Sequence, residues 1–242
     1  MKLAILAVAC LSYQATAQTL HSPNLIRLVQ TPRTGFTVPM NSGDAVNGIE
    51  LIGMTSVTGH PETWEMETHT SFAGLEDFDM ARPPAVEKSA QARTLIAFHR
   101  QWWSNRPDEA IQAMRRARFI QVSLYRISVG AEAEFAELLR TRKQGLDSMN
   151  IDRPDMVYQV IAGGPSGTFL VISPLYSLKQ LDDGVARSAA AYLRSTNTPS
   201  GKAAVNQLEI SHENLIFRVD PRISSVSPEF ASPDPTFWKP GN

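Results

Sequence analysis

The chain has 242 residues, of which 43% are hydrophobic, and its 23 Lys and Arg against 24 Asp and Glu give a formal net charge of −1. These values are typical of a globular protein with a packed core. They lack the clustered basic excess of a nucleic-acid-binding protein, so we expect no nucleic-acid partner.

The first seventeen residues have the pattern of a secretory signal. Lys2 supplies the initial positive charge, residues 3–11 form an apolar run, and residues 15–17 give the small-x-small pattern of a signal-peptidase site. We therefore expect cleavage near Ala17/Gln18 and export to the periplasm or the medium. The apolar run is shorter than the roughly 20 residues that span a membrane, and we expect no later span.

Cys10 is the only cysteine of the chain. A lipoprotein junction at Ala9-Cys10 is the alternative to the signal-peptidase site, but cleavage there would leave too short an apolar stretch. If the signal is removed at Ala17, the mature protein has no disulfide, no thiol nucleophile and no cysteine ligand for a metal.

The first half of the mature chain, residues 20–117, has strand-like and helix-like patterns. In chain order we expect a strand, a short helix, a hairpin of two strands and a longer helix (residues 24–35, 36–47, 48–59, 63–69 and about 85–103). On the longer helix, His99 shares an apolar stripe with Leu95 and Ile96, which predicts a packed core histidine.

The second half, residues 118–227, repeats this order. We expect a strand, a helix, a hairpin, a further helix and a last helix that leads into a closing strand (residues 118–129, 131–149, 156–163, 168–174, 176–193 and 203–219). Gly163 to Gly167 read as the hairpin turn, and His212 is expected at a helix end. A strand-helix-strand-strand-helix-strand order run twice predicts an α+β protein of duplicated ferredoxin-like halves.

Three segments carry a family resemblance: VSLYRISVGAEAEF, MVYQVIAGGPSGTFLVISPLYSLKQLDD and ENLIFRVDPRISSVSPEFASPDPTFWKP. With them the chain resembles the dimeric α/β-barrel superfamily, which includes NIPSNAP-like and antibiotic-monooxygenase-like proteins, and more narrowly its exported bacterial members. The resemblance implies a barrel of two four-stranded sheets and no particular activity. Two halves in one chain would close this barrel as an internal pseudo-dimer, in a monomer or a homodimer.

Strand alternation predicts a polar row inside that barrel. If Trp64 and Met66 lie under the helices, as Leu170 and Ile172 should, the intervening side chains face the interior. The ligand-pocket candidates are then Glu65, Glu67, His69, Ser123, Tyr125 and Gln159.

This row of carboxylate, imidazole and phenol groups leaves several chemistries open. It can bind a divalent metal, act as general acid and base, or be the solvated face of an edge strand. Heme is a further option, with His99 or His69 as the axial ligand, as in some members of the superfamily. We expect no cofactor.

The remaining segment, residues 228–242, is rich in proline and aromatic residues. Proline excludes a regular helix, but Phe230, Phe237 and Trp238 are costly to leave in water, so we expect the tail to lie across the barrel or a partner. The leading hypothesis is an exported protein that binds a small ligand in the barrel interior. The alternatives are a cofactor-independent oxygenase or isomerase with His69 or Glu67 as base and Tyr125 as hydrogen-bond donor, and a protein-interaction module. The sequence leaves open whether any reaction is catalysed.

Overall fold

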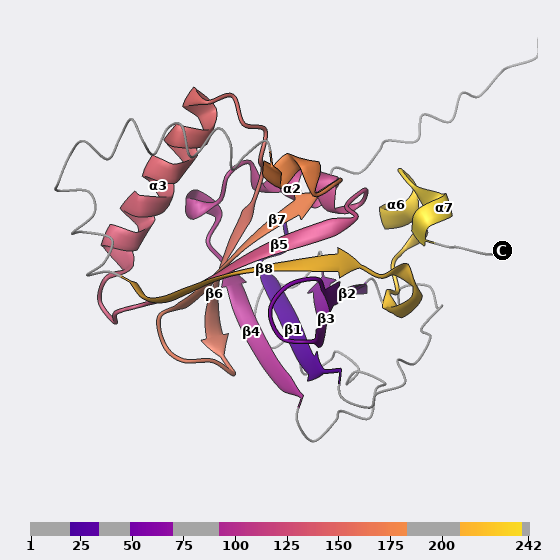
Figure 1. Ribbon diagram of the computed structural model, residues 1–242, viewed down its shortest axis with the longest axis horizontal. Coiled ribbons are helices and arrows are strands. Elements are labelled where there is room, and N and C mark those ends of the chain that lie inside the picture. The colour runs from indigo at the N-terminus through magenta and orange to yellow at the C-terminus, as the bar shows by residue number, and fades with distance from the viewer. Residues whose placement is uncertain (1–19, 34–48, 70–91, 183–208, 239–242) are drawn as a thin grey trace, which may run out of the picture.

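The computed structural model describes residues 20–33, 49–69, 92–182 and 209–238 (Figure 1). The strands are β1 Leu25–Pro32, β2 Ile49–Ser56, β3 Glu62–His69, β4 Arg93–His99, β5 Phe119–Ile127, β6 Met156–Ala162, β7 Thr168–Leu175 and β8 Glu209–Val219. The helices in this part of the chain are η1 Gln101–Trp103, α2 Pro107–Met114, α3 Glu132–Ser148, η2 Pro221–Ile223, α6 Pro228–Ala231 and α7 Pro235–Trp238.

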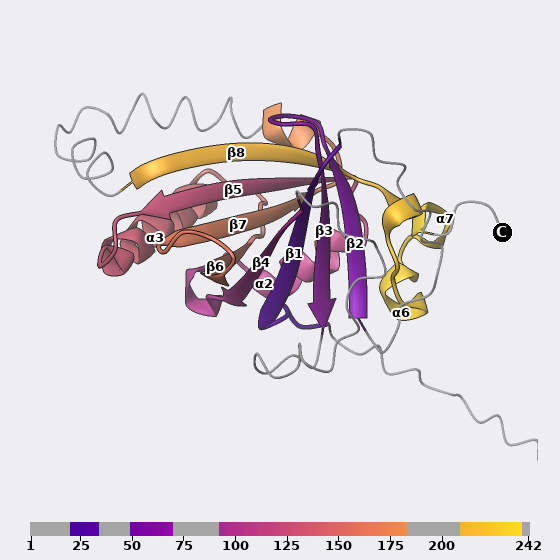
Figure 2. The same ribbon diagram turned by 90° about the horizontal axis from the view of Figure 1, so that it is seen from below.

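The eight strands form one closed antiparallel barrel in the order β1-β3-β2-β8-β5-β7-β6-β4 (Figure 2). Two runs of four consecutive strands share one internal order, β4-β1-β3-β2 and β8-β5-β7-β6, in which the fourth strand is followed by the first, third and second. The two runs join where β2 pairs with β8 and β4 with β6. The protein is therefore of the α+β class, and its barrel closes within a single chain.

A packed apolar core fills the barrel interior. It contains buried side chains from all eight strands, because successive residues of each strand alternate between the inner and outer face. Its largest members include Trp64, Tyr158 and Phe217, and the rings of Trp64 and Phe217 lie 4.4 Å apart between centroids.

A second apolar cluster lies outside the barrel under α3, which runs beside β5, β6 and β7 (Figure 2). Phe135 and Leu139 of the helix pack against Val157, Phe169 and Val171 of the sheet. The helical spacing expected over residues 131–149 is confirmed, and its apolar stripe is what attaches α3 to the barrel.

The tail packs against the barrel, as expected. Phe230 and Trp238 belong to the interior cluster, and the Trp238 Nε1–H donates to the carbonyl oxygen of Arg115 at 2.7 Å. The tail also forms two single-turn helices, contrary to the expectation of no helix. Pro228 and Pro235 stand at their first positions, where a missing N–H costs nothing.

The helix expected over residues 85–103 is wrong for its last part. Residues 93–99 form strand β4, with Leu95, Ala97 and His99 buried and Phe98 exposed between them. His99 is a core residue, as predicted, but on a strand. Residues 85–91 and the helices expected over 36–47 and beyond 182 lie outside the described residues.

His212 also lies on a strand, β8, and the expected helix end there is wrong. The predicted turn between β6 and β7 is confirmed, since Gly163 and Gly167 both adopt a positive φ, of 80° and 76°.

Candidate functional site

The inner and outer faces of the strands are the reverse of those expected from the sequence. Leu170, Ile172, Trp64 and Met66 point into the barrel and belong to its interior cluster, whereas the alternate residues of β7 lie under α3. Every residue of β7 is buried, so the alternation separated its two faces without showing which one points inward.

The predicted ligand-pocket row therefore lies outside the barrel. Ser123 and Tyr125 pair with Val171 and Phe169 under α3, and Gln159 pairs with Phe169 as well. Paired residues of antiparallel strands share a face, so these candidates point away from the interior. The interior is filled by apolar side chains, which corrects the expectation of a ligand pocket there.

The two candidate carboxylates of β3, Glu65 and Glu67, point outward too. Glu67 is 4% exposed and forms an ion pair with Arg27, whose Nε donates to Oε2 at 2.6 Å. This engagement makes Glu67 a structural partner of β1 instead of the free base that the enzyme hypothesis required. Glu65 is half-buried, and the side chain of His69 lies outside the described residues.

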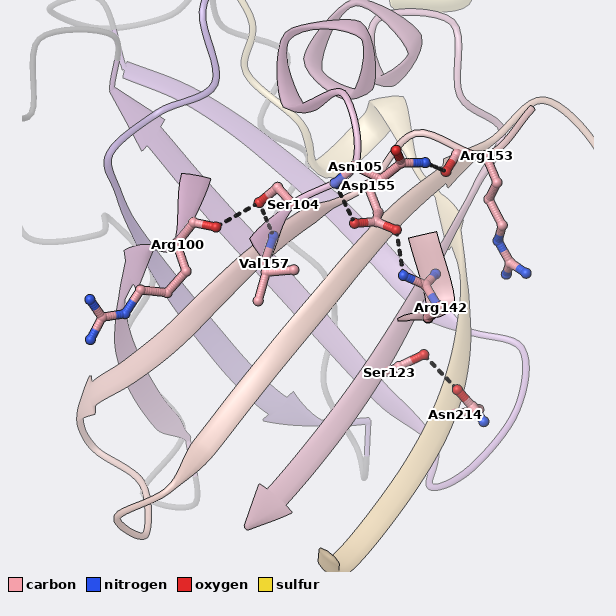
Figure 3. A network of polar contacts seen from close by, with 9 residues as sticks. All are labelled: Arg100, Ser104, Asn105, Ser123, Arg142, Arg153, Asp155, Val157 and Asn214. Carbon is pink, nitrogen blue, oxygen red and sulfur yellow. Dashed lines mark hydrogen bonds and ion pairs between the residues drawn. The ribbon is translucent and has the colours of Figure 1, made fainter. Parts of the chain in front are cut away.

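A different set of polar and aromatic side chains comes together on the outer face of β5 and β8. Ser123 stands opposite Asn214 and donates to its Oδ1 at 2.6 Å (Figure 3). Tyr125 stands opposite His212, and their rings stack at 4.1 Å between centroids with an interplanar angle of 10°. We call the group of Gln121, Ser123, Tyr125, Arg153, His212 and Asn214 the outer-face site.

Helix α3 and the segment before β6 flank this site. The Tyr125 ring lies 5.2 Å from that of Phe135 on α3, which fixes its apolar edge. Phe135 in turn contacts Trp103 at 6.1 Å between ring centroids. The tyrosine is thereby held between a helix on one side and an exposed imidazole on the other.

A buried carboxylate holds the segment before β6 in place. Asp155 is fully buried, and it accepts hydrogen bonds from the Asn105 backbone N–H at 3.1 Å and from Arg142 of α3 at 2.7 Å (Figure 3). The Asn105 amide donates to the carbonyl oxygen of Arg153 at 2.9 Å. Both contacts position Arg153 beside the sheet.

Arg153 is half-buried, and its Nε is buried and donates no hydrogen bond to any described residue. Burial and then the positive charge of Arg142 lower its pKa, while Asp155 and Tyr125 act in the opposite direction. The charge therefore lies within electrostatic reach of the Tyr125 phenol.

His99 is a buried, hydrogen-bonded residue of the core. Its Nε2 lies 3.1 Å from Ser104 Oγ, which donates to the Arg100 carbonyl and accepts from the Val157 N–H. Because the Ser104 hydroxyl proton is already used in the hydrogen bond to the Arg100 carbonyl, the His99 imidazole must donate from Nε2 to Ser104 Oγ. Burial lowers the His99 pKa to about 4, so the ring is neutral at pH 7.

Among the described residues, no group of three or more His, Cys, Asp or Glu side chains is arranged to hold a metal ion. In the same part of the chain no helix is long and apolar enough to cross a membrane.

The candidates predicted from the sequence include Ser123 and Tyr125 of the outer-face site, but not Arg153, His212 or Asn214. His212 and Asn214 would have been found if residues 209–219 had been taken as one strand, since they share its polar face. Nothing in the local pattern identifies Arg153, because its burial depends on the tertiary contacts of Asp155.

No family model and no curated protein matches the chain. Among solved structures, an anthrone oxidase-like protein is similar with a TM-score of 0.50 and 12% identity, covering 84% of this chain and 93% of that one. A candidate monooxygenase from Lactobacillus acidophilus is similar with a TM-score of 0.48 and 12% identity, covering 84% and 96%. The likeness to the anthrone oxidase-like protein shows a shared fold.

Proposed function

We propose that the protein binds a small, planar, oxygen-bearing molecule at the outer-face site. The observation that carries this proposal is the convergence of a partly open aromatic stack, Tyr125 on His212, with Arg153, whose buried Nε has no hydrogen-bond partner among the described residues. Binding sites combine apolar contact surface with a few polar groups that orient the ligand, and this region offers both. The described residues of the interior are mostly apolar, and two of its polar groups, the Tyr158 hydroxyl and the His99 imidazole, already have hydrogen-bond partners.

The test compares two tyrosines. Ligand-observed NMR measures binding of 1-naphthol and 1-naphthoate to the wild type, to Tyr125→Phe and to Tyr176→Phe, an exposed tyrosine away from the site. Tyr125→Phe keeps the ring and removes the hydroxyl, so we expect about fivefold to tenfold weaker binding, the loss of one hydrogen bond. Tyr176→Phe should bind like the wild type. Equal binding by all three proteins, or none, contradicts the proposal.

A cofactor-independent oxygenase is the second candidate, favoured by the fold shared with an anthrone oxidase-like protein and by the imidazole beside a phenol. In this scheme His212 takes a proton from an activated CH2 group of the bound substrate, and Arg153 stabilises the resulting enolate. The carbanion reduces O2 and combines with it to a hydroperoxide, which loses water to leave a carbonyl. One CH2 group and one O2 thus give one C=O and one H2O.

Oxygen consumption tests this candidate. With anthrone as the probe, an oxygen electrode compares the rate above spontaneous oxidation for the wild type, His212→Ala and His60→Ala. Removing a general base typically lowers the reaction rate about 100-fold or more. Replacement of the exposed His60 should leave the rate unchanged. Equal rates for wild type and His212→Ala contradict the catalytic role and leave ligand binding intact.

We also propose that the chain is exported and matures near Ala17, and that its two halves are ferredoxin-like units within one functional chain. The signal pattern supports the first point, and the repeated strand order and the barrel closed by one chain support the second. Intact and native mass spectrometry of the secreted protein test both. The interaction-module hypothesis loses its main support, because Phe230 and Trp238 are buried in the protein itself.

A further inference from the structure

We infer that the molecule bound at the outer-face site is an organic anion, a carboxylate or phenolate, whose charge pairs with Arg153. This inference rests on the proposed function and names the ligand class. It follows from how the charges around the site are paired.

One of the two arginines beside the site already has its counter-ion. Arg142 donates from its Nη1 to Asp155 Oδ2 at 2.7 Å, and the other carboxylate oxygen, Oδ1, accepts from the Asn105 backbone N–H. Each oxygen of Asp155 is therefore committed (Figure 3). Asp155 pairs directly with Arg142, whereas its charge acts on Arg153 without a hydrogen bond between the two side chains.

Arg153, the second arginine, is not hydrogen-bonded to Asp155 in the way that Arg142 is. Its Nε is buried with no hydrogen bond from the described residues, and it lies close enough to Arg142 for the two charges to repel. A guanidinium stays protonated in proteins, so it cannot relieve this cost by losing its proton. An anion that enters the site supplies the acceptor that Nε lacks among the described residues, and it adds a second counter-charge where Asp155 otherwise acts on two arginines.

The surroundings fit an anion carried on a planar body. The guanidinium is a planar fork that binds a carboxylate through two parallel hydrogen bonds. Tyr125 lies within electrostatic reach of it, and its ring belongs to the aromatic stack on β5 and β8. Ser123 and Asn214 add a hydroxyl and an amide on the same face. An aromatic acid is the ligand class that matches this combination of a guanidinium, an aromatic stack and neutral polar groups.

The experiment compares an anion with its neutral counterpart. Isothermal titration calorimetry measures the Kd of 1-naphthoate and of 1-naphthamide, which has the same rings and no charge. We expect the wild type to bind naphthoate at least about tenfold more tightly, and to lose part of this preference as salt is raised. Arg153→Gln should remove the preference.

Arg126→Gln is the matched control, because it removes the same charge from an exposed side chain at the end of β5. It should leave the preference unchanged. Arg153→Lys keeps the charge without the fork and should retain part of the preference, which covers the case in which Arg153→Gln does not fold.

The failures are distinguishable. Equal binding of naphthoate and naphthamide by the wild type, or an equal loss in Arg153→Gln and Arg126→Gln, overturns the anion inference and leaves the small-molecule site standing. Binding of neither compound overturns both. A preference for naphthoate that disappears in Arg153→Gln, persists in part in Arg153→Lys and is unchanged in Arg126→Gln supports both.

Discussion

Replacement of Trp64 by alanine tests whether the barrel interior is a packed core. The indole is 2% exposed, its ring centroid lies 4.4 Å from that of Phe217, and its Nε1–H donates to Glu62 at 2.7 Å. A tryptophan buries about 150–250 Å², which at about 25 cal/mol per Å² corresponds to about 4–6 kcal/mol. Aromatic-to-alanine replacements in cores cost about 3–5 kcal/mol, so we expect about 4 kcal/mol for Trp64→Ala.

Guanidinium denaturation followed by circular dichroism measures this loss, and Trp102→Ala is its control. Trp102 is 95% exposed, so its replacement should change the free energy of unfolding by less than about 0.5 kcal/mol. For a chain of this length, about 4 kcal/mol lowers Tm by roughly 8–16 °C.

The cavity left by Trp64→Ala offers a second readout. An apolar cavity of this size binds small aromatic molecules, so added indole should raise the Tm of Trp64→Ala and not that of the wild type. If Trp64→Ala lowers the free energy of unfolding by less than about 1 kcal/mol, or by as much as Trp102→Ala does, the interior is not a packed core. The barrel interior would then again be a candidate ligand site.

Further predictions concern buried groups and the tail. Burial raises the pKa of Glu50 above 4.5, so its contribution to stability is full below pH 4.5 and is lost as pH rises through the raised value. Glu50→Gln should remove this loss in thermal melts across pH, whereas Glu134→Gln, at an exposed position on α3, should not; identical pH profiles for both variants would count against the assignment. Burial lowers the pKa of His99 to about 4, so wild-type stability should fall by on the order of 3 kcal/mol between pH 6.5 and pH 4. This slope should be flatter in His99→Gln, and an imidazole that titrates near pH 6.5 by NMR would exclude the effect. Trp238→Ala should cost about 3 kcal/mol and expose the tail to limited proteolysis, and an unchanged digestion pattern would show that the tail is not anchored by this indole.

Much of the fold follows from local patterns. Period-two alternation placed strands β1, β2, β3, β5, β6 and β7 close to their observed bounds, and helical spacing placed α3. Strand β4 was missed because Leu95, Ile96 and His99 fit a helical stripe as well as part of an alternating strand. Short apolar segments support both periods, and the pairing partners that decide between them are far away in sequence.

The direction of each strand face could not be predicted in the same way. Both faces of β7 are buried, one against the opposite strands and one against α3, so hydrophobicity does not distinguish inside from outside. Ser123 and Tyr125 were identified as polar members of one face, but their partners come from β8 and the segment before β6. Arg153 becomes notable only because Asp155 is committed to Arg142.

A crystal structure of the protein with bound 1-naphthoate tests the central claim most directly. We expect electron density for the aromatic acid on the outer face of β5 and β8, with its carboxylate against Arg153 and its rings near Tyr125. Density for the acid among Trp64 and Met66 inside the barrel, or at a surface away from β5 and β8, would contradict the account.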